Sequence, residues 1–419
     1  MKEKGKQKKA KAKWTFMIYM AGDNTLSTAG DKDLKEMRKV GSTADVNVVA
    51  EFDNAGNRGT KRYHVKRKGV KEHVVSLGET DSGDPKVLID FIGWVAKTYP
   101  AERYALVLWN HGGGWEPSEM DKIARSVKAD NYSGRENSWR RASSMGRTFF
   151  RTTLEKIYSL QSVAARAICS DDGSGHSLDT IELGEVLAQA VKLLKKPLDI
   201  LGMDACLMSD LEVAYQAQPY VKYIVASEES EPNEGWPYDA VLHELVANPD
   251  QPTPDLATRI VNAYVNSYTK RGYTDPVTQS ALDLSKIDEL TKPLDDLSEA
   301  LIPRMASTRS EMDEALYATK AKFYYNTLWD VANLCEELAV KTKDDVIRQS
   351  ANEVRAKLQP NNKSFVIAEA HNGTKVERCG GVTIYLPPRV LSQISRYYGD
   401  LAYAKDHRWL AMLQAYQAT

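Results

Sequence analysis

The chain has 419 residues, of which 42% are hydrophobic and 27% are charged, and its formal net charge is −1. A chain of this length exceeds one ordinary hydrophobic core, so two domains or one elaborated domain are expected. The balanced charge argues against a protein that recruits nucleic acid or acidic substrates through a global electrostatic field. Its four cysteines show no C-x-x-C spacing, which argues against a structural zinc site or a disulfide framework.

The N-terminal arm, residues 1–13, is strongly basic, because residues 2–13 contain seven Lys and one Glu. It lacks the apolar segment of a signal peptide or membrane span. We expect a disordered, solvated arm, with binding to nucleic acid or to an anionic surface as the alternative. If residue 1 is the native start, the sequence predicts a cytoplasmic protein; if a signal was removed, it predicts a secreted or periplasmic one.

Residues 14–250 alternate apolar runs with amphipathic segments, as in a parallel sheet covered by helices on both faces. The expected strands are 14–20, 46–52, 104–109, 167–170, the run that ends at Asp204, and 223–227, with a hairpin within 61–77. The expected helices are 26–40, 85–98, 180–194 and 210–217, the third starting with a capping box of Asp179 and Glu182. In such sheets functional groups lie beyond the carboxyl ends of the strands.

The segment 116–147 interrupts this alternation, since it is polar and rich in Ser, Asn and Gly. A loop of this length inside a compact domain is usually functional or disordered. Its basic residues include Arg125, Lys128, Arg135, Arg140, Arg141 and Arg147.

Residues 251–419 are predicted to form a mostly helical region that packs on the core of residues 14–250. The expected helices are 255–270, 286–305, 309–320, 327–357 and 401–418. A strand is expected at 278–282, and a β-hairpin from 365–370 and 381–386.

Two side chains with catalytic potential follow two of the expected strands. Cys206 comes directly after the apolar run 198–204, and His111 follows the run 104–109, which continues into N-H-G-G-G-W. An adjacent imidazole generates a thiolate and later protonates the leaving amine. The glycines after His111 let backbone N–H groups approach a ligand and hold an oxyanion. Cys169, Cys335 and Cys379 have no such setting, and we interpret them as packing residues.

Asp204 lies two residues before Cys206, so in extended backbone both side chains point to the same face. A carboxylate beside a catalytic thiol disfavours the thiolate, so its presence at this position requires a functional explanation. Pairing with a cationic substrate group, Arg or Lys, is one such explanation. A cap of the following helix is the alternative.

Four motifs resemble the clostripain-type cysteine peptidases of the caspase-like clan: W-T-F-M-I-Y-M-A-G-D-N-T-L, L-W-N-H-G-G-G-W, L-G-M-D-A-C-L-M and V-A-S-E-E-S-E-P-N-E-G-W-P-Y-D. The similarity extends over nearly the whole chain from Trp14. It implies a caspase-like α/β/α sandwich with a mainly parallel sheet, and a cysteine endopeptidase with a His111–Cys206 dyad. It also implies that the N–H groups of Gly112 and Cys206 hold the oxyanion.

The resemblance further implies cleavage of protein or peptide substrates after Arg or Lys, with Asp204 as the specificity carboxylate. The loop 227–236 would line the cleft, which makes Ser227 and Glu228 candidate substrate contacts. A caspase-like binding protein without turnover is the alternative function. Many relatives cut themselves after the catalytic His, so the basic residues of 116–147 are candidate autocleavage sites.

Calcium is a further possible cofactor, because some relatives depend on it. The segment D-D-G-S-G-H-S-L-D-T-I-E spaces Asp171, Asp179 and Glu182 like parts of an EF-hand loop. Gly173 and Gly175 occupy ligand positions and His176 replaces the turn glycine, so an EF-hand is not expected. The sequence therefore predicts no metal ligands.

Overall fold

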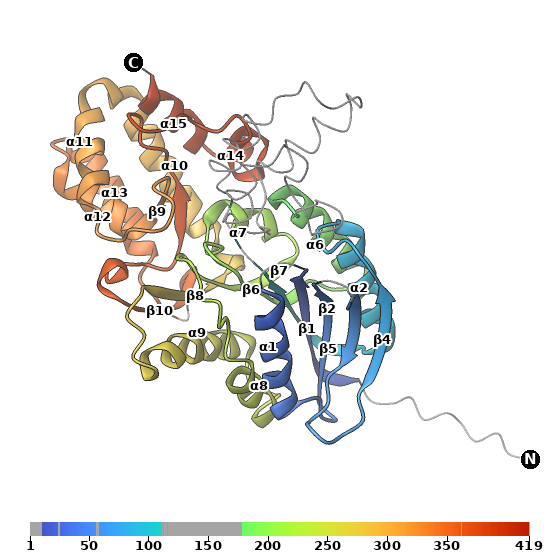
Figure 1. Cartoon of the computed structure of the whole chain (residues 1–419). Helices are drawn as coiled ribbons and strands as arrows, with labels where there is room; N and C mark the ends of the chain where they lie inside the picture. The colour runs from blue at the N-terminus through green and yellow to red at the C-terminus, as the bar shows by residue number, and fades with distance from the viewer. Residues whose placement is uncertain are drawn as a thin grey trace, which may run out of the picture.

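The structure is a computed structural model that describes residues 11–23, 26–55, 58–110, 112, 115, 178–361 and 363–418. Within these residues the centre of the molecule is a nine-stranded sheet in the order β10-β8-β7-β6-β5-β1-β2-β3-β4 (Figure 1). Its strands are β1 (Ala12–Gly22), β2 (Val46–Asn54), β3 (Thr60–His64), β4 (His73–Gly78), β5 (Ala101–Trp109), β6 (Leu198–Asp204), β7 (Val221–Ala226), β8 (Val277–Asp283) and β10 (Val366–Asn372).

The middle of the sheet is parallel and both margins are antiparallel. Strands β2, β1, β5, β6 and β7 run in one direction. The hairpin β3–β4 extends the sheet beyond β2, and β8 and β10 extend it beyond β7. The mainly parallel sheet and the hairpin within 61–77 are therefore confirmed.

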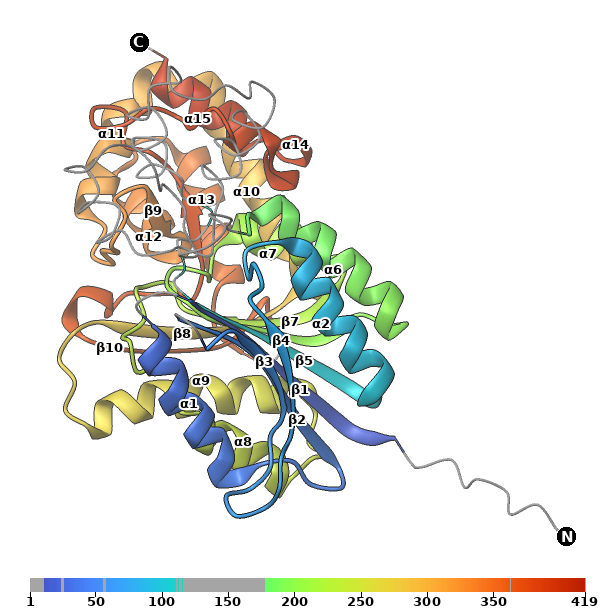
Figure 2. The same cartoon turned by 45° about the vertical axis from the view of Figure 1, so that its right-hand side comes forward.

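Helices cover both faces of the sheet, as Figures 1 and 2 show. One face carries α1 (Ser27–Val40), α8 (Tyr238–Ala247) and α9 (Thr253–Lys270), and the other carries α2 (Pro85–Thr98), α6 (Thr180–Leu194) and α7 (Leu211–Ala217). The predicted capping box of α6 is present: the Asp179 carboxylate accepts from the N–H groups of Ile181 and Glu182, and the Glu182 carboxylate accepts from the N–H of Asp179.

The C-terminal helices gather beside the second face, around a small sheet of β9 (Leu328–Asp330) and β11 (Thr383–Tyr385). They are α10 (Asp288–Leu301), α11 (Met305–Ala318), α12 (Val331–Lys341), α13 (Asp345–Lys357), α14 (Ala402–Asp406) and α15 (Trp409–Gln417). Their buried side chains belong to the same hydrophobic cluster as those of α2, α6 and α7. Among the described residues, no helix is long and apolar enough to span a bilayer.

Three details of the C-terminal region differ from the prediction. The expected hairpin of 365–370 and 381–386 is wrong, because β10 pairs with the sheet strand β8 and β11 pairs with β9. The expected helix 327–357 is interrupted, since Asp330 and Asp344 each cap a new helix by accepting N–H groups. The expected helix 401–418 is likewise two helices, α14 and α15.

The sheet also crosses the predicted boundary at residue 250. Strands β8 and β10 belong to residues 251–419, yet they are hydrogen-bonded members of the central sheet. The C-terminal region therefore builds part of the sheet.

Candidate active site

The site lies where the connections of the sheet change sides. From β1 the chain passes through α1 to β2, whereas α2 leads to β5 on the opposite side of β1. A crevice at the carboxyl ends of the strands is the usual ligand site of such a sheet. Strands β5 and β6 end together there, with Trp109 in register with Asp204 and the N–H of Asn110 donating to the Asp204 carbonyl at 3.3 Å.

Cys206 follows β6 and is partly exposed. Its sulfur accepts a hydrogen bond from the N–H of Glu231 at 3.2 Å. The next residue, Leu207, has φ of 64°, a left-handed conformation that costs a non-glycine residue about 1–2 kcal/mol. Its N–H donates to the Glu229 carbonyl at 3.1 Å. A sharp, buried turn therefore fixes the direction of the thiol at the strand end.

Gly112 lies against the backbone of this turn. A Cβ at Gly112 would lie 2.2 Å from the Cys206 carbonyl oxygen and 2.7 Å from its nitrogen. Only a residue without a side chain allows this approach. His111 lies outside the described residues, whereas its neighbours Asn110 and Gly112 are described.

The replacement Gly112→Ala is therefore expected to damage the site without unfolding the protein. The added methyl group must push the segment after β5 away from Cys206, and displacements of about 1 Å at a reacting centre cost about 10²-fold in rate. Thermal unfolding and peptide hydrolysis measured on the same preparation check this. Wild-type kcat/KM in the Gly112→Ala enzyme would contradict the close packing. Gly93→Ala is a control, because a Cβ at this position in α2 would meet only side-chain atoms of Leu193, at 3.8 Å or more.

A cavity of about 30 Å³ lies beside the thiol. Its lining includes Leu26, Trp109, Asn110, Asp204, Cys206 and Glu231. This volume is about that of one water molecule, so the cavity is closed to a side chain of the size of Arg. Asp204 and Cys206 line the same cavity, as their spacing in the sequence predicts.

Three carboxyl groups lie at this cavity: those of Asp204 and Glu231 line it, and that of Asp33 contacts the lining residue Trp109. Asp204 accepts from the Trp236 N–H at 3.2 Å and from the Tyr238 hydroxyl at 2.8 Å. Asp33, on α1, accepts from Trp109 Nε1 at 2.7 Å. The third is the fully buried carboxyl of Glu231, which interacts with that of Asp204.

Burial raises the pKa of all three groups. Desolvation, followed by the charge of Asp204, raises the pKa of Asp33 to about 9. Desolvation also raises the pKa of Asp204, against the hydrogen bonds from Glu231, Tyr238 and Trp236. The pKa of Glu231 lies well above its usual range, because of burial and then the nearby Asp204 charge. Burial thus favours the protonated forms of these acids, whereas a bound cation would favour the ionised forms.

Two predicted substrate contacts lie elsewhere. Ser227 and Glu228 are fully buried and do not line the cavity. Ser227 Oγ donates to the Glu229 carbonyl at 2.9 Å, and Glu228 accepts from the Gly381 N–H at 3.0 Å. Both hold the loop rather than face the cavity. Cys335 is buried in α12, in agreement with its interpretation as a packing residue.

Sequence reasoning missed Asp33 and Glu231. Asp33 does carry a signal, because it lies with Leu34, Met37 and Gly30 on the buried face of α1, where an acid is unexpected. Glu231 is one of four glutamates between residues 228 and 234, and nothing in their order distinguishes it. The six candidate autocleavage residues lie outside the described residues.

A calcium site finds no support in the described part of the chain. There, no group of three or more His, Cys, Asp or Glu side chains is arranged to hold a metal ion. Asp179 and Glu182, two members of the EF-hand-like spacing, are engaged in the cap of α6. Asp171 lies outside the described residues.

The sequence profile of the Clostripain family matches residues 18–137 and 156–416. The chain belongs to the clostripain family. Clostripain from Hathewaya histolytica is 27% identical over 267 residues, which are 56% of this chain and 42% of that protein. The match thus spans less than half the length of this clostripain.

Solved structures of clostripain-family (C11) proteases share the fold. An inactive zymogen C11 protease from Parabacteroides distasonis has a TM-score of 0.64 at 21% identity, over 95% of this chain and 99% of that one. A secreted C11 cysteine protease from Bacteroides thetaiotaomicron, bound to an irreversible peptide inhibitor, has a TM-score of 0.61 at 18% identity, over 96% and 99%. The predicted α/β sandwich is confirmed.

Proposed function

We propose that this clostripain-family chain is a cysteine endopeptidase that hydrolyses peptide bonds after Arg or Lys. The observation that carries the proposal is the cavity in which the Cys206 thiol lies beside the carboxyls of Asp204 and Glu231. It joins a nucleophile to buried acids at the carboxyl edge of the sheet, where this fold class binds its ligands.

The mechanism is acyl transfer through a thioester. His111 takes the proton of Cys206, and the sulfur attacks the carbonyl carbon of the scissile bond. The N–H groups of Gly112 and Cys206 donate to the developing oxyanion. His111 then gives its proton to the leaving amine, a thioester forms, and water hydrolyses it to the free carboxylate and thiol. The approach of Gly112 to the Cys206 backbone supports this role for the two N–H groups.

Specificity for a cation follows from the acids around the cavity. A guanidinium or ammonium group that enters would pair with the ionised form of Asp204, assisted by Glu231 and at longer range by Asp33. Because the cavity holds only about 30 Å³, a substrate side chain must widen it. Recognition therefore couples widening of the cavity to ionisation of the acids.

Binding of an Arg side chain is expected to release protons and to strengthen as pH rises. Burial raises the pKa values of the three acids, that of Asp33 to about 9, so their ionisation is disfavoured in the free pocket. A cation favours their charged forms and lowers those pKa values. Calorimetric titration of the Cys206→Ala protein with an Arg peptide, in buffers of different ionisation enthalpy, measures the protons released. A norleucine peptide is the control; equal proton release by both peptides would contradict the coupling.

A panel of fluorogenic peptides that differ only in the residue before the cleaved bond tests the proposed function. We expect hydrolysis after Arg and Lys, and at least about 10²-fold less after norleucine or Gln, because one buried charge pair contributes about 3 kcal/mol. The same assay in the presence and absence of a chelator tests calcium dependence. Absence of hydrolysis by freshly purified protein and by protein incubated to allow self-cleavage would favour the binding protein without turnover instead.

Self-cleavage in 116–147 is the second part of the proposal. Arg125, Lys128, Arg135, Arg140, Arg141 and Arg147 fit the specificity inferred above. The family profile leaves residues 138–155 unmatched, so the last three of these sites lie where this chain departs from the family pattern.

A further inference from the structure

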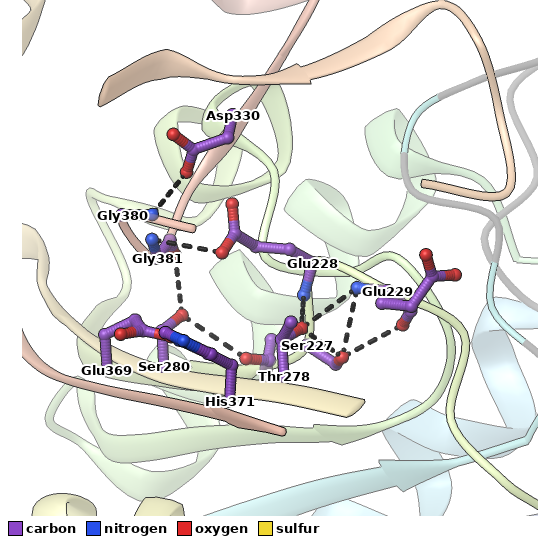
Figure 3. Close-up of polar contacts among 11 residues, drawn as sticks. Ser227, Glu228, Glu229, Thr278, Ser280, Asp330, Glu369, His371, Gly380 and Gly381 are labelled. Carbon is purple, nitrogen blue, oxygen red and sulfur yellow. Dashed lines mark hydrogen bonds and ion pairs between the residues drawn. The ribbon is translucent and has the colours of Figure 1, made fainter. Parts of the chain in front are cut away.

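A second group of acids, two of them buried and one partly buried, lies beside the loop that contacts the thiol (Figure 3). Glu228 lies in the loop after β7, Asp330 at the start of α12, and Glu369 on β10. Glu228 is 1% exposed and Asp330 0%. The proposed mechanism uses neither of them, and the burial of two acids side by side requires an explanation.

The two acids bind consecutive amides of one turn. Glu228 Oε2 accepts from the Gly381 N–H at 3.0 Å, and Asp330 Oδ2 accepts from the Gly380 N–H at 2.6 Å. No N–H or hydroxyl group donates to the buried Glu228 Oε1, and the Glu228 carboxyl forms a side-chain hydrogen bond with that of Asp330. Burial has the largest effect on the pKa of Glu228, and the charge of Asp330 has the next largest. Figure 3 shows both side chains directed to this turn. A proton between the two carboxyls is what keeps such a pair together.

The backbone of Glu228 continues directly into the contacts of the thiol. The N–H groups of Glu228 and Glu229 both donate to Thr278 Oγ1, at 2.9 and 3.1 Å. The Glu229 carbonyl accepts from the Leu207 N–H at 3.1 Å, and the Glu231 N–H donates to the Cys206 sulfur at 3.2 Å. A shift of Glu228 is therefore transmitted to the Cys206 sulfur and to the residue that follows it.

The turn at Gly381 also contacts the segment that follows the thiol. Its carbonyl accepts from Ser209 Oγ at 2.7 Å and from Ser280 Oγ at 2.6 Å. The Ser209 N–H donates to the Ser227 carbonyl at 2.8 Å. Ser209 lies three residues after the thiol, so one turn of the C-terminal region anchors both the loop and the segment that follows Cys206.

We propose that Glu228 and Asp330 share one proton and act as a pair of positioning residues that hold the loop 227–231 against the Cys206 thiol. The pair touches neither substrate nor reacting atoms, and acts through the Glu231 N–H and the turn at Leu207. This inference rests on the proposed peptidase function. It assigns to the C-terminal region a part in aligning the nucleophile.

The surroundings of the pair keep one proton in place. Burial, then the charge of Asp330, raises the pKa of Glu228 well above its usual range, while burial raises that of Asp330 to about 6. Glu369 faces both carboxyls from β10, and His371 lies 2.8 Å from Glu369 and has a raised pKa. The thiols of Cys379 and Cys335 complete the surroundings. Loss of the shared proton as pH rises places two negative charges together.

The replacement Glu228→Gln tests the shared proton, because an amide mimics the protonated acid at every pH. Its NH₂ group faces Asp330 and its oxygen still accepts from Gly381. We expect kcat at pH 7 to stay within about threefold of wild type and to fall less steeply above pH 8. Glu228→Ala, which removes the pair, is expected to lower kcat about 10²-fold with a smaller change in KM, as misplacement of a nucleophile does.

Thermal unfolding provides a readout that is independent of catalysis. A folded-state pKa above the unfolded value of about 4.3 means that the folded protein keeps a proton that the unfolded chain releases. Stability is then unaffected at low pH and decreases as pH rises through and above that unfolded value. The Tm of Glu228→Gln relative to wild type should therefore rise with pH.

Glu212→Gln is the matched control, since Glu212 is a buried acid beside Asp210 that binds the Tyr385 N–H and the Tyr398 hydroxyl. It makes no contact with the loop 227–231, so it should change the pH dependence of Tm but not that of kcat. Superimposable kcat and Tm profiles for wild type and Glu228→Gln, or full kcat in Glu228→Ala, would overturn the inference. A wild-type protein that cleaves no Arg peptide would refute the proposed function, whereas the Tm comparison would still decide whether the folded protein keeps a proton at Glu228.

Discussion

The Cys206→Ala protein is expected to lose at least about 10³-fold in kcat/KM on Arg peptides while it unfolds at the wild-type temperature. Removal of the nucleophile abolishes the thioester route and leaves only binding and oxyanion stabilisation. The turn around residue 206 is held by backbone hydrogen bonds of Leu207 and Ser209, which the replacement leaves intact. Steady-state hydrolysis together with calorimetric unfolding checks both halves of this prediction.

A second thiol provides the control for this experiment. Cys335 is buried in α12, away from the cavity, so Cys335→Ala should change stability and lower kcat/KM far less than Cys206→Ala does. Equal hydrolysis by wild type and Cys206→Ala would exclude Cys206 as the nucleophile.

The same pair of proteins tests self-cleavage. On prolonged incubation, the wild type should convert to fragments with new N-termini after basic residues of 116–147, whereas Cys206→Ala should stay a single band. If both proteins stay full-length, self-cleavage is rejected, and the assignment of Cys206 as the nucleophile is unaffected.

Asp204→Asn is expected to lower kcat/KM about 10²–10³-fold for peptides with Arg before the cleaved bond and much less for norleucine peptides. Loss of a buried charge partner leaves the guanidinium unpaired, which costs about 3–4 kcal/mol. The Asp204→Asn protein should be no less stable than wild type at alkaline pH. Burial raises the pKa of Asp204, so ionisation of this residue in wild type opposes folding. Hydrolysis of matched Arg and norleucine peptides, with Tm at two pH values, measures both effects.

Asp199→Asn is the appropriate control, because Asp199 is buried at the opposite end of the same strand. Its carboxylate accepts from the Tyr104 N–H at 3.0 Å and from Lys222 Nζ at 2.7 Å. That replacement should lower stability and leave the preference for Arg unchanged. An unchanged preference in Asp204→Asn would instead move the specificity to Glu231 or to residues outside the cavity.

The order of strands and helices in the first half of the chain could be read from the sequence, because its parallel strands are mainly apolar segments bounded by turn residues. Helix α2 begins at Pro85 and α6 begins after Asp179, as their capping signals predict. The pairing of β10 could not be read. Its partner depends on which strand edge is open in three dimensions, and the local sequence favoured the nearer segment 381–386.

The residues of the candidate site also differ in whether the sequence could predict them. Asp204 and Cys206 share one strand end, so their alternation predicts a common face and the structure gives them a common cavity. Glu231 reaches that cavity from the loop after β7, and Asp33 on α1 contacts its wall at Trp109. Such convergence depends on packing between distant segments, which no local spacing encodes.

The antiparallel margin formed by β8 has a consequence for any shortened form of this protein. A chain that ended at residue 250 would leave β7 (Val221–Ala226) as an open edge, with unpaired backbone groups along an apolar strand. Exposed edges of this kind recruit strands from other molecules and start aggregation. The shortened chain would also uncover the side of α7 that packs on the C-terminal helices. The C-terminal region therefore protects the sheet that carries the thiol from association between copies.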